Sequence, residues 1–470
     1  MNSEWPLHSL SDFINVKHGF AFKGEFFKAE RTSDLLVTPG NFAIGGGFKS
    51  DKFKFYDGPV PEDYVLSEGD LIVTMTDLSK QADTLGYSAL VPAIAGSRLL
   101  HNQRVGLVEF KNDELDITYL YFLLRSKEYR HHVVSTATGS TVKHTSPTKI
   151  LSFAFRKPPK DIQIDIGKKL IALEEKIENN TQTNQTLEQI AQAIFKSWFV
   201  DFDPVKAKIE TLAAGGSADD AELAAIRVIS AKTIDELNTL KASNPEVFNK
   251  LAQTAALFPA AMQDSELGEI PEGWSVSSLS ELIKITGGGT PKRSEELYWN
   301  GNIPWFSVKD VPTEGNVFVV DTDEKITELG LNKSSTKLLP KGTTIITARG
   351  TVGKLALVGT DMCMNQSCYG ILGKSVGDFY NYFNLKEAVS TLQRNTHGAV
   401  FDTITTQTFD TYSLAFSGVE LANKFDALVA PLLQNIETNV RQNIELATLR
   451  DTLLPKLLSG EIDLTSEVTA

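Results

Sequence analysis

The chain has 470 residues and a net charge of −13, with 41% hydrophobic and 22% charged residues. This composition is typical of a globular protein, and a chain of this length is expected to form roughly two to four compact units. Only two cysteines are present, Cys363 and Cys368, which argues against a disulfide scaffold and a zinc module. Neither a signal peptide nor a run of about 18 apolar residues is found, so we expect a cytoplasmic protein without a membrane partner.

The negative charge is unevenly distributed along the chain. Residues 161–275 and 416–470 carry net charges of −9 and −4, whereas residues 1–160 and 276–415 carry +1 and −1. A net negative charge argues against a nucleic-acid partner. Because the charge lies outside two nearly neutral segments, those segments remain compatible with nucleic-acid binding, although their composition shows no basic face.

Residues 1–157 predict a mixed α+β domain. Glycine clusters such as Gly45 to Gly47, β-rich runs such as Leu71 to Thr74 and an amphipathic stretch from Ile117 to Val134 support this interpretation. Pro158 and Pro159 cannot continue a strand or a helix, so we expect the domain to end there.

Residues 158–204 predict a long helix. Apolar residues and two asparagines recur at every third or fourth position, which is the pattern of a coiled-coil helix. These positions are Ile166, Leu170, Leu173, Ile177, Asn180, Asn184, Leu187, Ala191, Ile194 and Trp198. Residues 205–267 then predict a helical insert or linker of four short helices, with a structural or partner-docking role.

The second half of the chain repeats the first. Residues 268–416 predict a second α+β domain, residues 417–462 a second long helix and residues 463–470 a tail. The matching segments are Trp5 and Leu10 to Ile14 with Trp274 and Leu279 to Ile283, Ser67 to Asp70 with Pro340 to Thr343, His101 to Gln103 with Met364 to Gln366, and Thr138 to Ser140 with Thr396 to Gly398. The fold class is therefore predicted as α+β, with two copies of a globular domain followed by a long coiled-coil helix in a pseudo-two-fold repeat.

The helical pattern returns 259 positions later, with both asparagines reproduced as Asn439 and Asn443. A buried asparagine in a coiled coil lowers stability but fixes the register of the helices. In an antiparallel pair, Asn180 would lie near Asn443 and Asn184 near Asn439. The alternative is two ordinary amphipathic helices whose asparagines face water. Pro431 falls inside the second pattern, so this helix either begins near Val429 or is kinked at the proline.

No catalytic motif is found. The segment Gly370 to Ser375 is two residues too short for a phosphate-binding loop, and the seven histidines lack the spacing of metal ligands. Asp323, Glu324 and Lys325 are similar to the carboxylate–lysine sets of nucleases, but a chance match is expected among 59 acidic residues. Neither a Gly-x-Ser-x-Gly elbow nor the motifs of an adenine methyltransferase are present. We therefore expect a chain that is not an enzyme and holds no metal or cofactor.

Several strings in the second half resemble those of one known family. They are Gly287 to Lys292, Ile303 to Trp305, Ala348 to Gly353, Leu453 to Ile462, the entry segment Gly268 to Trp274 and, in the first half, Phe195 to Phe199. In this order and with two tandem repeats, they resemble the DNA specificity subunit of type I restriction-modification enzymes over nearly the whole chain. The first domain fits less well, because His18 to Lys23 replaces the Gly-Gly-Thr-Pro-Lys string.

The resemblance implies two target recognition domains, each reading one half of a split, asymmetric site in double-stranded DNA. It implies that the two domains are separated by two long antiparallel coiled-coil helices, which set the distance between the half-sites and dock two methylation subunits. Those subunits would bring S-adenosylmethionine, and restriction subunits would add an ATP-driven translocating nuclease. The chain itself would only read sequence. The helical insert has no counterpart after the second helix.

Candidate DNA contacts are polar residues in or near the glycine-rich loops, because paired donors and acceptors read base edges and cations contact phosphates. In the second domain they are Thr290, Lys292, Arg293, Ser307, Lys309, Arg349, Thr351 and Lys354. In the first domain they are His18, Lys23, Asn41, Lys80, Arg104, Ser140 and Lys143. Glycine neighbours would let the backbone approach DNA closely. The alternative for each is a plain loop with solvated charges. Asn365 and Gln366 recur as Asn102 and Gln103 in a domain expected to read other bases, so a shared structural role is expected for them.

Two other functions remain open from the residues alone. A non-catalytic coiled-coil adaptor whose α+β domains bind proteins would explain the helices and the acidity, but not the loop strings. A nuclease or methyltransferase with an unrecognised site is the other alternative.

Overall fold

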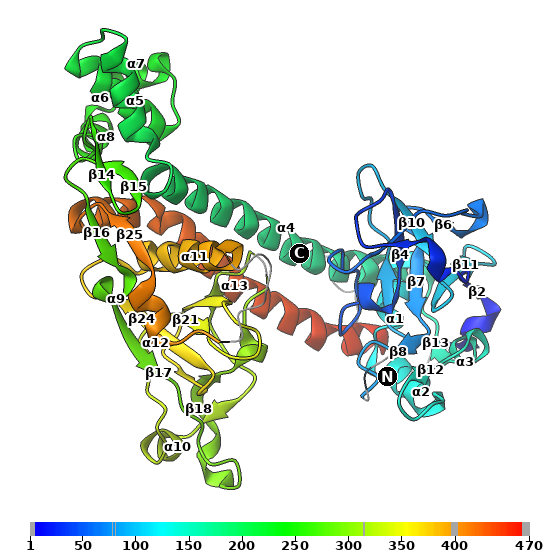
Figure 1. Ribbon diagram of the computed structural model, residues 1–470. Coiled ribbons are helices and arrows are strands. Elements are labelled where there is room, and N and C mark those ends of the chain that lie inside the picture. The colour runs from blue at the N-terminus through cyan, green and yellow to red at the C-terminus, as the bar shows by residue number, and fades with distance from the viewer. Residues whose placement is uncertain (1–4, 78, 80, 314, 396–402, 463–470) are drawn as a thin grey trace, which may run out of the picture. The chain divides into compact units, whose positions relative to one another are not determined.

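The computed structural model describes residues 5–77, 79, 81–313, 315–395 and 403–462. It divides into two compact units, of which unit 1 holds residues 1–177 and 445–470 and unit 2 holds residues 178–444. Each unit combines helices with short sheets (Figure 1), so the predicted α+β class is confirmed. The unit boundaries cut across the predicted long helices, because each helix contributes one end to each unit.

Unit 1 is built on two sheets. A four-stranded antiparallel sheet has the order β2-β11-β7-β9, and a five-stranded sheet has the order β3-β5-β4-β10-β6 with β4 and β10 parallel. The strands are β1 (Leu7–Ser9), β2 (Ile14–His18), β3 (Phe27–Lys28), β4 (Asp34–Val37), β5 (Lys54–Tyr56), β6 (Val65–Leu66), β7 (Leu71–Thr74), β8 (Thr76–Asp77), β9 (Ser88–Leu90), β10 (Arg98–His101), β11 (Val105–Phe110), β12 (Lys143–His144) and β13 (Ala154–Arg156). The predicted amphipathic stretch forms two helices, α1 (Ile117–Leu123) and α2 (Lys127–Thr136), and α3 (Pro147–Leu151) follows.

Unit 2 contains an equivalent domain and the insert. Its main sheet has the order β17-β24-β21-β22-β19, and a smaller sheet has the order β20-β18-β23. The strands are β14 (Met262–Ser265), β15 (Gly268–Pro271), β16 (Ser275–Ser278), β17 (Ile283–Gly287), β18 (Trp299–Phe306), β19 (Phe318–Val319), β20 (Lys325–Ile326), β21 (Thr344–Thr347), β22 (Leu355–Val358), β23 (Cys363–Met364), β24 (Cys368–Gly373) and β25 (Ser413–Phe416). The helices of this domain are α9 (Leu279–Leu282), α10 (Glu328–Asn332), α11 (Asp378–Asn395) and α12 (Thr406–Thr411).

The sequence repeat is also a structural repeat. The amide of Leu10 donates to the carbonyl of Phe153 at 3.0 Å, and that of Leu279 donates to Tyr412 at 2.9 Å, so each domain closes its first and last strands in the same way. The turns before β7 and β21 match as well, because Gly69 and Gly342 both have positive φ angles, of 83° and 90°. The predicted match between residues 138–140 and 396–398 falls partly outside the described residues.

The insert contains the four predicted helices. They are α5 (Asp203–Ala213), α6 (Ala218–Ser230), α7 (Ile234–Ser243) and α8 (Pro245–Ala255), and they cluster beside the C-terminal end of the helix that precedes them (Figure 1). Lys208 is buried among them, and its ammonium donates to Glu222 at 2.5 Å and to the carbonyls of Ala255 and Phe258 at 2.9 and 2.7 Å. The β14–β15 hairpin after the insert was not predicted, since its few residues lack a period-2 apolar pattern.

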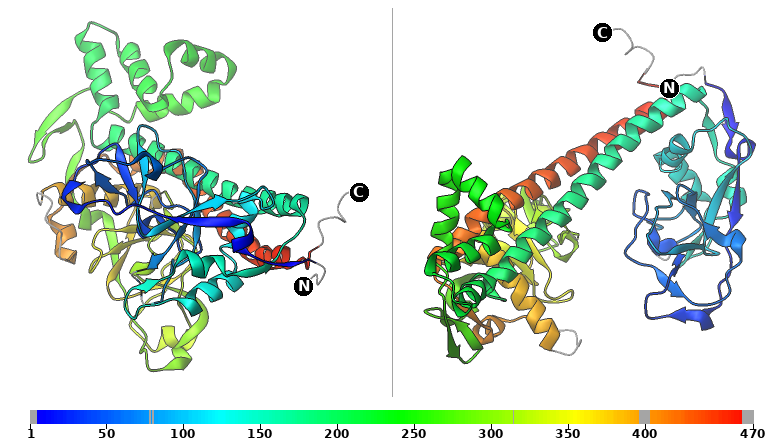
Figure 2. Two further views of the ribbon diagram at one scale, coloured as in Figure 1. Left: turned by 90° about the vertical axis from the view of Figure 1, so that its right-hand side faces the viewer. Right: turned by 90° about the horizontal axis from the view of Figure 1, so that it is seen from above.

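Two 40-residue helices, α4 (Lys160–Phe199) and α13 (Val419–Leu458), run side by side (Figure 2). In unit 1, Ile166 and Leu170 of α4 share a core with Leu457 of α13. In unit 2, Trp198 contacts Phe425, with ring centroids 6.0 Å apart. Within each unit the two helices are therefore antiparallel. The expectation that α13 could begin near Val429 is wrong, because the helix starts at Val419 and continues through an exposed Pro431.

Both asparagine contacts expected from the sequence are present. The side-chain nitrogen of Asn180 donates to the side-chain oxygen of Asn443 at 2.8 Å. The side-chain nitrogen of Asn439 donates to the side-chain oxygen of Asn184 at 2.9 Å. Asn180 and Asn184 are buried. A shift of the helices by one turn, about four residues, would pair at most one asparagine of each helix and would separate the other two. A buried amide would then lose its partner, which is unfavourable.

Each domain also contacts a carboxylate on α4. In unit 1, Glu174 accepts a hydrogen bond from the Tyr121 hydroxyl at 2.8 Å and pairs with Arg125 at 2.6 Å and with Arg450 of α13 at 2.9 Å. In unit 2, Glu188 accepts from the Tyr382 hydroxyl at 3.3 Å and from Lys386 at 2.5 Å. A tyrosine and a cation four residues later make this contact in both domains.

In the part of the chain that the structure describes, no helix combines the length and the apolarity that crossing a membrane requires.

The first residue of α11, Asp378, lies half-buried beside Asp426 of α13. Burial, and next the charge of Asp426, raise the pKa of Asp378 from 3.8 to about 6. The folded chain therefore holds the proton on Asp378 more tightly than the unfolded chain does. The stability that this proton contributes is complete below pH 3.8 and is lost as the pH rises through about 6.

We expect the variant Asp378→Asn to lose less stability than the wild type between pH 4 and pH 7, because an amide does not ionise. The measurement is the urea midpoint of unfolding at a series of pH values. Asp410→Asn, at an exposed position of α12, is the matched control and should follow the wild type. Equal pH dependence of Asp378→Asn and wild type would contradict the prediction.

Candidate nucleic-acid interface

The loops predicted to contact DNA converge on one segment in unit 2. This segment, Met364 to Ser367, connects β23 to β24. The amide of Gly289 donates to the carbonyl of Met364 at 2.9 Å, that of Asn365 donates to Phe306 at 2.9 Å, and that of Ala348 donates to Ser367 at 2.8 Å. The loops that follow β17, β18 and β21 are thereby joined. We call residues 288–293, 306–309, 348–351 and 364–367 loop cluster 2.

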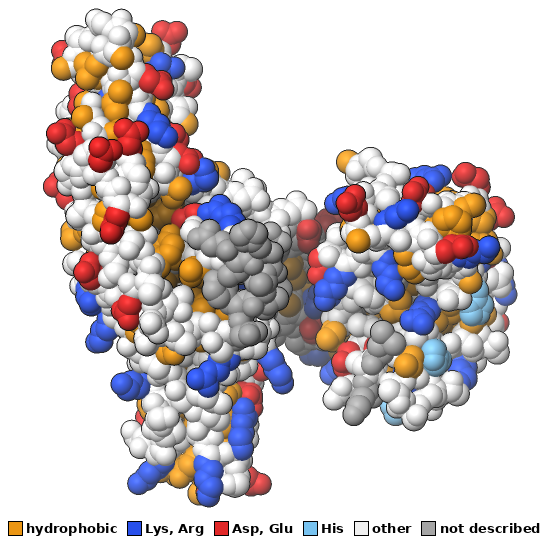
Figure 3. Space-filling view, viewed as in Figure 1, with side chains coloured by type: hydrophobic (Ala, Val, Ile, Leu, Met, Phe, Trp, Pro, Cys, Tyr) orange, Lys and Arg blue, Asp and Glu red, His pale blue; other side chains and the backbone are white. Residues whose placement is uncertain are grey.

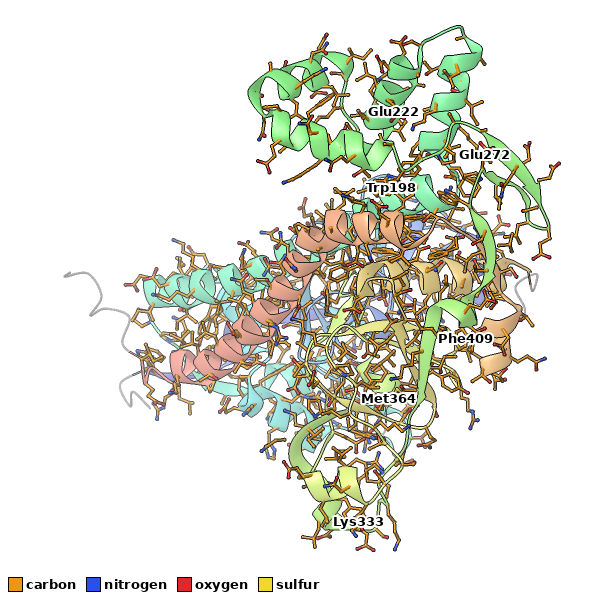
Figure 4. The ribbon with its side chains drawn as sticks, turned by 90° about the vertical axis from the view of Figure 1, so that its left-hand side faces the viewer. Trp198, Glu222, Glu272, Lys333, Met364 and Phe409 are labelled. Carbon is orange, nitrogen blue, oxygen red and sulfur yellow. The ribbon has the colours of Figure 1, made fainter. Side chains whose placement is uncertain are left out.

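Figure 4 shows the place of loop cluster 2 within unit 2. Met364 lies in the body of the domain, between Lys333 just beyond α10 and Trp198 at the end of α4. The cluster is thus held by strand ends on a packed domain and is not carried on a free loop.

Two glycines of the Gly-Gly-Gly-Thr-Pro string pack against the protein itself. A Cβ atom on Gly288 would lie 1.8 Å from the carbonyl oxygen of Asn365, and one on Gly289 would lie 2.4 Å from the backbone nitrogen of Thr336. A side chain at Gly288 or Gly289 would therefore overlap the protein itself, so these glycines let the loops of the cluster meet.

Unit 1 holds the same arrangement. The amide of Phe20 donates to the carbonyl of His101 at 2.8 Å, and that of Met75 donates to Arg104 at 3.0 Å. A Cβ atom on Gly19 would lie 2.1 Å from the carbonyl oxygen of Asn102, as at Gly288. We call residues 18–23, 38–41, 75–77 and 101–104 loop cluster 1. The poorly matching string His18 to Lys23 therefore occupies the position of Gly287 to Lys292.

The repeated asparagine has a structural role, as expected. The side-chain oxygen of Asn102 accepts from the amide of Arg104 at 3.2 Å, and that of Asn365 accepts from the amide of Ser367 at 3.0 Å. Each asparagine thus forms the same local turn at the centre of its cluster.

Arg293 of loop cluster 2 packs over two tryptophan rings. Its guanidinium carbon lies 3.9 Å from the ring centroid of Trp299 and 5.0 Å from that of Trp305, and the group forms a two-pronged ion pair with Glu324. The hydrogen bonds of this pair raise the pKa of Arg293 and hold the pKa of Glu324 below its ordinary value. Trp305 is itself fixed, since its indole nitrogen donates to the carbonyl of Gly289 at 3.0 Å. The guanidinium is partly exposed and held in one orientation.

Most of the other predicted contact residues are exposed at or near the two clusters. The exposed ones are His18, Lys23, Arg104, Ser140, Lys292, Lys309, Arg349 and Thr351, and the half-buried ones are Lys143, Thr290 and Ser307. Lys143 joins cluster 1 because β12 pairs with β8, opposite Asp77. Thr290 contacts Gln366 through its hydroxyl. The predicted residue Lys80 lies outside the described residues.

The prediction that Asn41 contacts DNA is wrong. This residue is fully buried, and its side chain accepts from the amide of Thr38 at 2.9 Å and donates to the carbonyl of Lys49 at 3.0 Å. Asp310 occupies the equivalent position in unit 2, where it accepts from the amide and hydroxyl of Ser307, both at 2.8 Å. Asn41 therefore caps a short turn and has no surface for DNA.

Lys354 is exposed and borders a cavity of about 800 Å³ in unit 2. The cavity is also lined by Gln185 and Glu188 of α4, by one face of α11 and by Pro312, Thr313, Gly315, Asn316 and Val317. The role of Lys354 in DNA binding stays a prediction.

Sequence reasoning missed Trp299 and the structural pairing of Glu324. The rings of Trp299 and Trp305 are neighbours, with centroids 5.2 Å apart, but the register of β18 shifts between Trp299 and Ile303. Alternation along a regular strand therefore could not have predicted this arginine platform. The pairing of Arg293 with Glu324 spans 31 positions and had no local signal.

The chain was compared with known proteins. A family model described as the type I restriction modification DNA specificity domain matches residues 2–189 and 271–417. The chain is 33% identical over 355 residues to the type I restriction enzyme HindI specificity subunit of Haemophilus influenzae, covering 73% of this chain and 77% of that protein. It is 26% identical over 184 residues to the MjaIX specificity subunit of Methanocaldococcus jannaschii, covering 38% and 43%. Among solved structures, a type I restriction-modification system S subunit from M. genitalium aligns with a TM-score of 0.50 and 16% identity, over 97% of this chain and 96% of that chain, which supports the fold.

We expect Asn102→Ala to lower the free energy of unfolding by about 1 kcal/mol, because the amide of Arg104 loses its acceptor. Asn102→Asp keeps the acceptor and should retain most of that stability. The thermal midpoint is the measurement, and Gln103→Ala, at the exposed neighbour, is the control. The same result is expected for Asn365→Ala. Unchanged thermal midpoints in both alanine variants would contradict the shared structural role.

Proposed function

The chain belongs to the family of type I restriction-modification DNA specificity subunits, and from this premise we propose how its two domains select DNA. Each domain reads one half of a bipartite, asymmetric site in double-stranded DNA. Loop cluster 1 contacts one half and loop cluster 2 the other. The chain takes no part in bond making or breaking.

The observation that carries this proposal is the duplicated loop cluster. The scaffold contacts are the same in both copies, from the close approach of Gly19 and Gly288 to the turns of Asn102 and Asn365. The exposed side chains around this scaffold differ. Ala21 stands where unit 2 has Thr290, for example. A common scaffold with different side chains is what two readers of different half-sites require.

The charge distribution supports the placement of DNA. Lys and Arg side chains gather over the part of unit 2 that carries β18 and α10, whereas acidic side chains gather over the insert (Figure 3). Phosphate contacts supply affinity without sequence information, and we assign them to the exposed lysines Lys23, Lys292 and Lys309. Base contacts are assigned to Arg104, Arg293, Arg349 and Thr351, and the remaining candidates serve either purpose.

The helix pair supplies the second half of the proposed mechanism. We assign to α4 and α13 the distance between the half-sites and the docking of two methylation subunits. S-adenosylmethionine and ATP would then be bound by the partner methylation and restriction subunits and not by this chain. The antiparallel pairing and the buried asparagines support a fixed length for the pair. No observation favours the alternative of a protein-binding adaptor.

The test is selection from a DNA library by the chain in complex with its methylation subunits. A bipartite motif with two different halves and a fixed gap is the expected result. Selection of a single contiguous motif, or of no motif, would overturn the proposal.

We expect Arg349→Ala to relax base preference in one half-site only, at a cost of about 1–3 kcal/mol for the preferred base. Arg104→Ala, in the other domain, should relax only the other half-site. Lys309→Ala should weaken binding to all sequences. It should also reduce the slope of the logarithm of the binding constant against the logarithm of the salt concentration by about one, the value for one phosphate contact. Library selection and salt titration measure these effects. If Arg349→Ala and Arg104→Ala altered the same half-site, the one-domain-per-half assignment would be wrong.

We also expect the gap between half-sites to follow the length of the helix pair. Inserting four helix-forming residues after Ile177 in α4 and four after Ile444 in α13 keeps the antiparallel pairing and lengthens the pair by about 6 Å. The gap should grow by about one to two base pairs while both half-sites stay the same. The same four residues inserted at Gly215, between α5 and α6, form the control. An unchanged gap would contradict this role of the helices.

A further inference from the structure

The two domains rest on the helix pair through equivalent helices. Tyr119 and Tyr121 of α1 correspond to Tyr380 and Tyr382 of α11, each 261 positions later, and all four are buried. The N-terminal end of α1 packs on α4 in unit 1, and that of α11 packs on α13 in unit 2. The first turn of a helix presents amides without intrahelical partners, so each contact needs an acceptor.

In unit 2 the long helix supplies the acceptor. One carboxylate oxygen of Asp426 on α13 accepts from the amides of Phe379 and Tyr380, at 2.8 and 2.9 Å. The domain makes room for this carboxylate with a glycine. A Cβ atom on Gly377 would lie 2.2 Å from the carboxylate carbon of Asp426.

In unit 1 the domain supplies the acceptor instead. Asp116 accepts from the amide of Tyr119 at 2.9 Å and so caps its own helix. Here the long helix provides the glycine, because a Cβ atom on Gly167 of α4 would lie 3.2 Å from the carboxylate oxygen of Asp116 and 3.0 Å from Thr118. One turn earlier, Gln163 of α4 accepts from the amide of Asp116 at 2.9 Å and donates to the carbonyl of Glu114 at 3.1 Å.

These residues occupy equivalent positions in the repeat. Asp116 corresponds to Gly377 at the domain offset of 261, and Gly167 corresponds to Asp426 at the helix offset of 259. Gln163 likewise corresponds to Ala422. The capping carboxylate and the glycine have therefore been exchanged across the contact between domain and helix. Each contact contains one capping carboxylate, and in unit 2 Asp378 lies beside it.

We propose that these contacts are complementary keys that determine which domain fits which position on the helix pair. Seat 1, formed by Gln163 and Gly167, accepts a domain that brings its own capping carboxylate. Seat 2, formed by Ala422 and Asp426, accepts a domain with a glycine at that place. A domain moved from seat 1 to seat 2 would place the side chain of Asp116 where Gly377 now leaves room for the carboxylate of Asp426. A domain moved from seat 2 to seat 1 would leave its helix without a cap.

Because each domain is expected to read its own half-site, the keys also fix which half-site lies at which end of the helix pair. This consequence rests on the proposed function. The pairing of keys and seats does not, since it concerns only how the domains pack.

The test moves the capping carboxylate of unit 2 from position 426 on the long helix to position 377 in the domain, which corresponds to Asp116 in unit 1. Three full-length variants are made: Asp426→Gly, Gly377→Asp and the double variant. The readout is amide hydrogen exchange at Phe379 and Tyr380, with the first-turn amides of α1 as the internal control. Asp426→Gly removes the cap and should speed exchange at these two amides about ten-fold. Gly377→Asp adds a further carboxylate beside Asp378 and Asp426, and its Cβ atom would overlap the carboxylate of Asp426, so it should also destabilise the contact.

The double variant separates a key from general damage. It recreates the arrangement of unit 1, so protection of Phe379 and Tyr380 should return toward the wild-type level. The proposal would be overturned if Phe379 and Tyr380 exchanged as fast in the double variant as in the faster of the two single variants. Unchanged exchange in Asp426→Gly would overturn it as well.

A second test exchanges a whole domain within the full chain. Residues 276–416 are replaced by a second copy of residues 7–157, which brings a second Asp116 against Asp426. The chimera is compared with one in which that copy carries Asp116→Gly. The corrected chimera should have the higher thermal midpoint and, with its methylation subunits, should select DNA carrying the domain 1 half-site twice. A corrected chimera no more stable than the uncorrected one would overturn the keys. If stability follows the keys but the wild-type chain selects no bipartite DNA, the proposed function fails and the keys stand.

Discussion

The packing of α4 against α13 in unit 2 depends on the hydrogen bond between the side chains of Asn184 and Asn439. A primary amide inside a helix interface is unfavourable unless it is paired, so it permits one register of α4 against α13 and penalises the others. Asn184 also donates to Asn316 at 3.3 Å, in a loop of the second domain. The register of the helices and the position of that loop are therefore linked through one side chain.

The same helix pair holds each domain by charge as well as by packing. Glu174 binds Tyr121, Arg125 and Arg450 in unit 1, and Glu188 binds Tyr382 and Lys386 in unit 2. These carboxylates are mostly buried, and each is compensated by cations and a hydroxyl, as a buried charge requires. The tyrosines and cations are equivalent between the domains, but the carboxylates are not, since both come from α4. The repeat is thus symmetric in its scaffold and asymmetric in the charges that attach the domains.

The loop clusters show the same division between scaffold and surface. Backbone contacts at Gly19 and Gly288, and turns at Asn102 and Asn365, are shared because they hold three loops together. Exposed positions such as Ala21 and Thr290 are free of that constraint and differ. A domain built in this way can change the side chains that it presents to DNA without losing its fold.

The sequence by itself determined the α+β class, the internal repeat, the two long helices and the family. Each of these follows from local periodicity or from strings that recur in order. The predicted pairing of Asn180 with Asn443 and of Asn184 with Asn439 followed from the repeated asparagines, because only one antiparallel register pairs both asparagines of one helix with both of the other.

Only the tertiary structure decided what individual polar residues do. Asn41, predicted as a DNA contact, is buried as a turn cap, and Gly288 and Gly289 let the loops of cluster 2 pack on one another. The Arg293–Glu324 pair and the exchange of carboxylate and glycine between Asp116–Gly167 and Gly377–Asp426 join residues far apart in the sequence. Whether a polar side chain faces solvent or a buried partner depends on which distant segment lies against it, and local sequence carries no record of that partner.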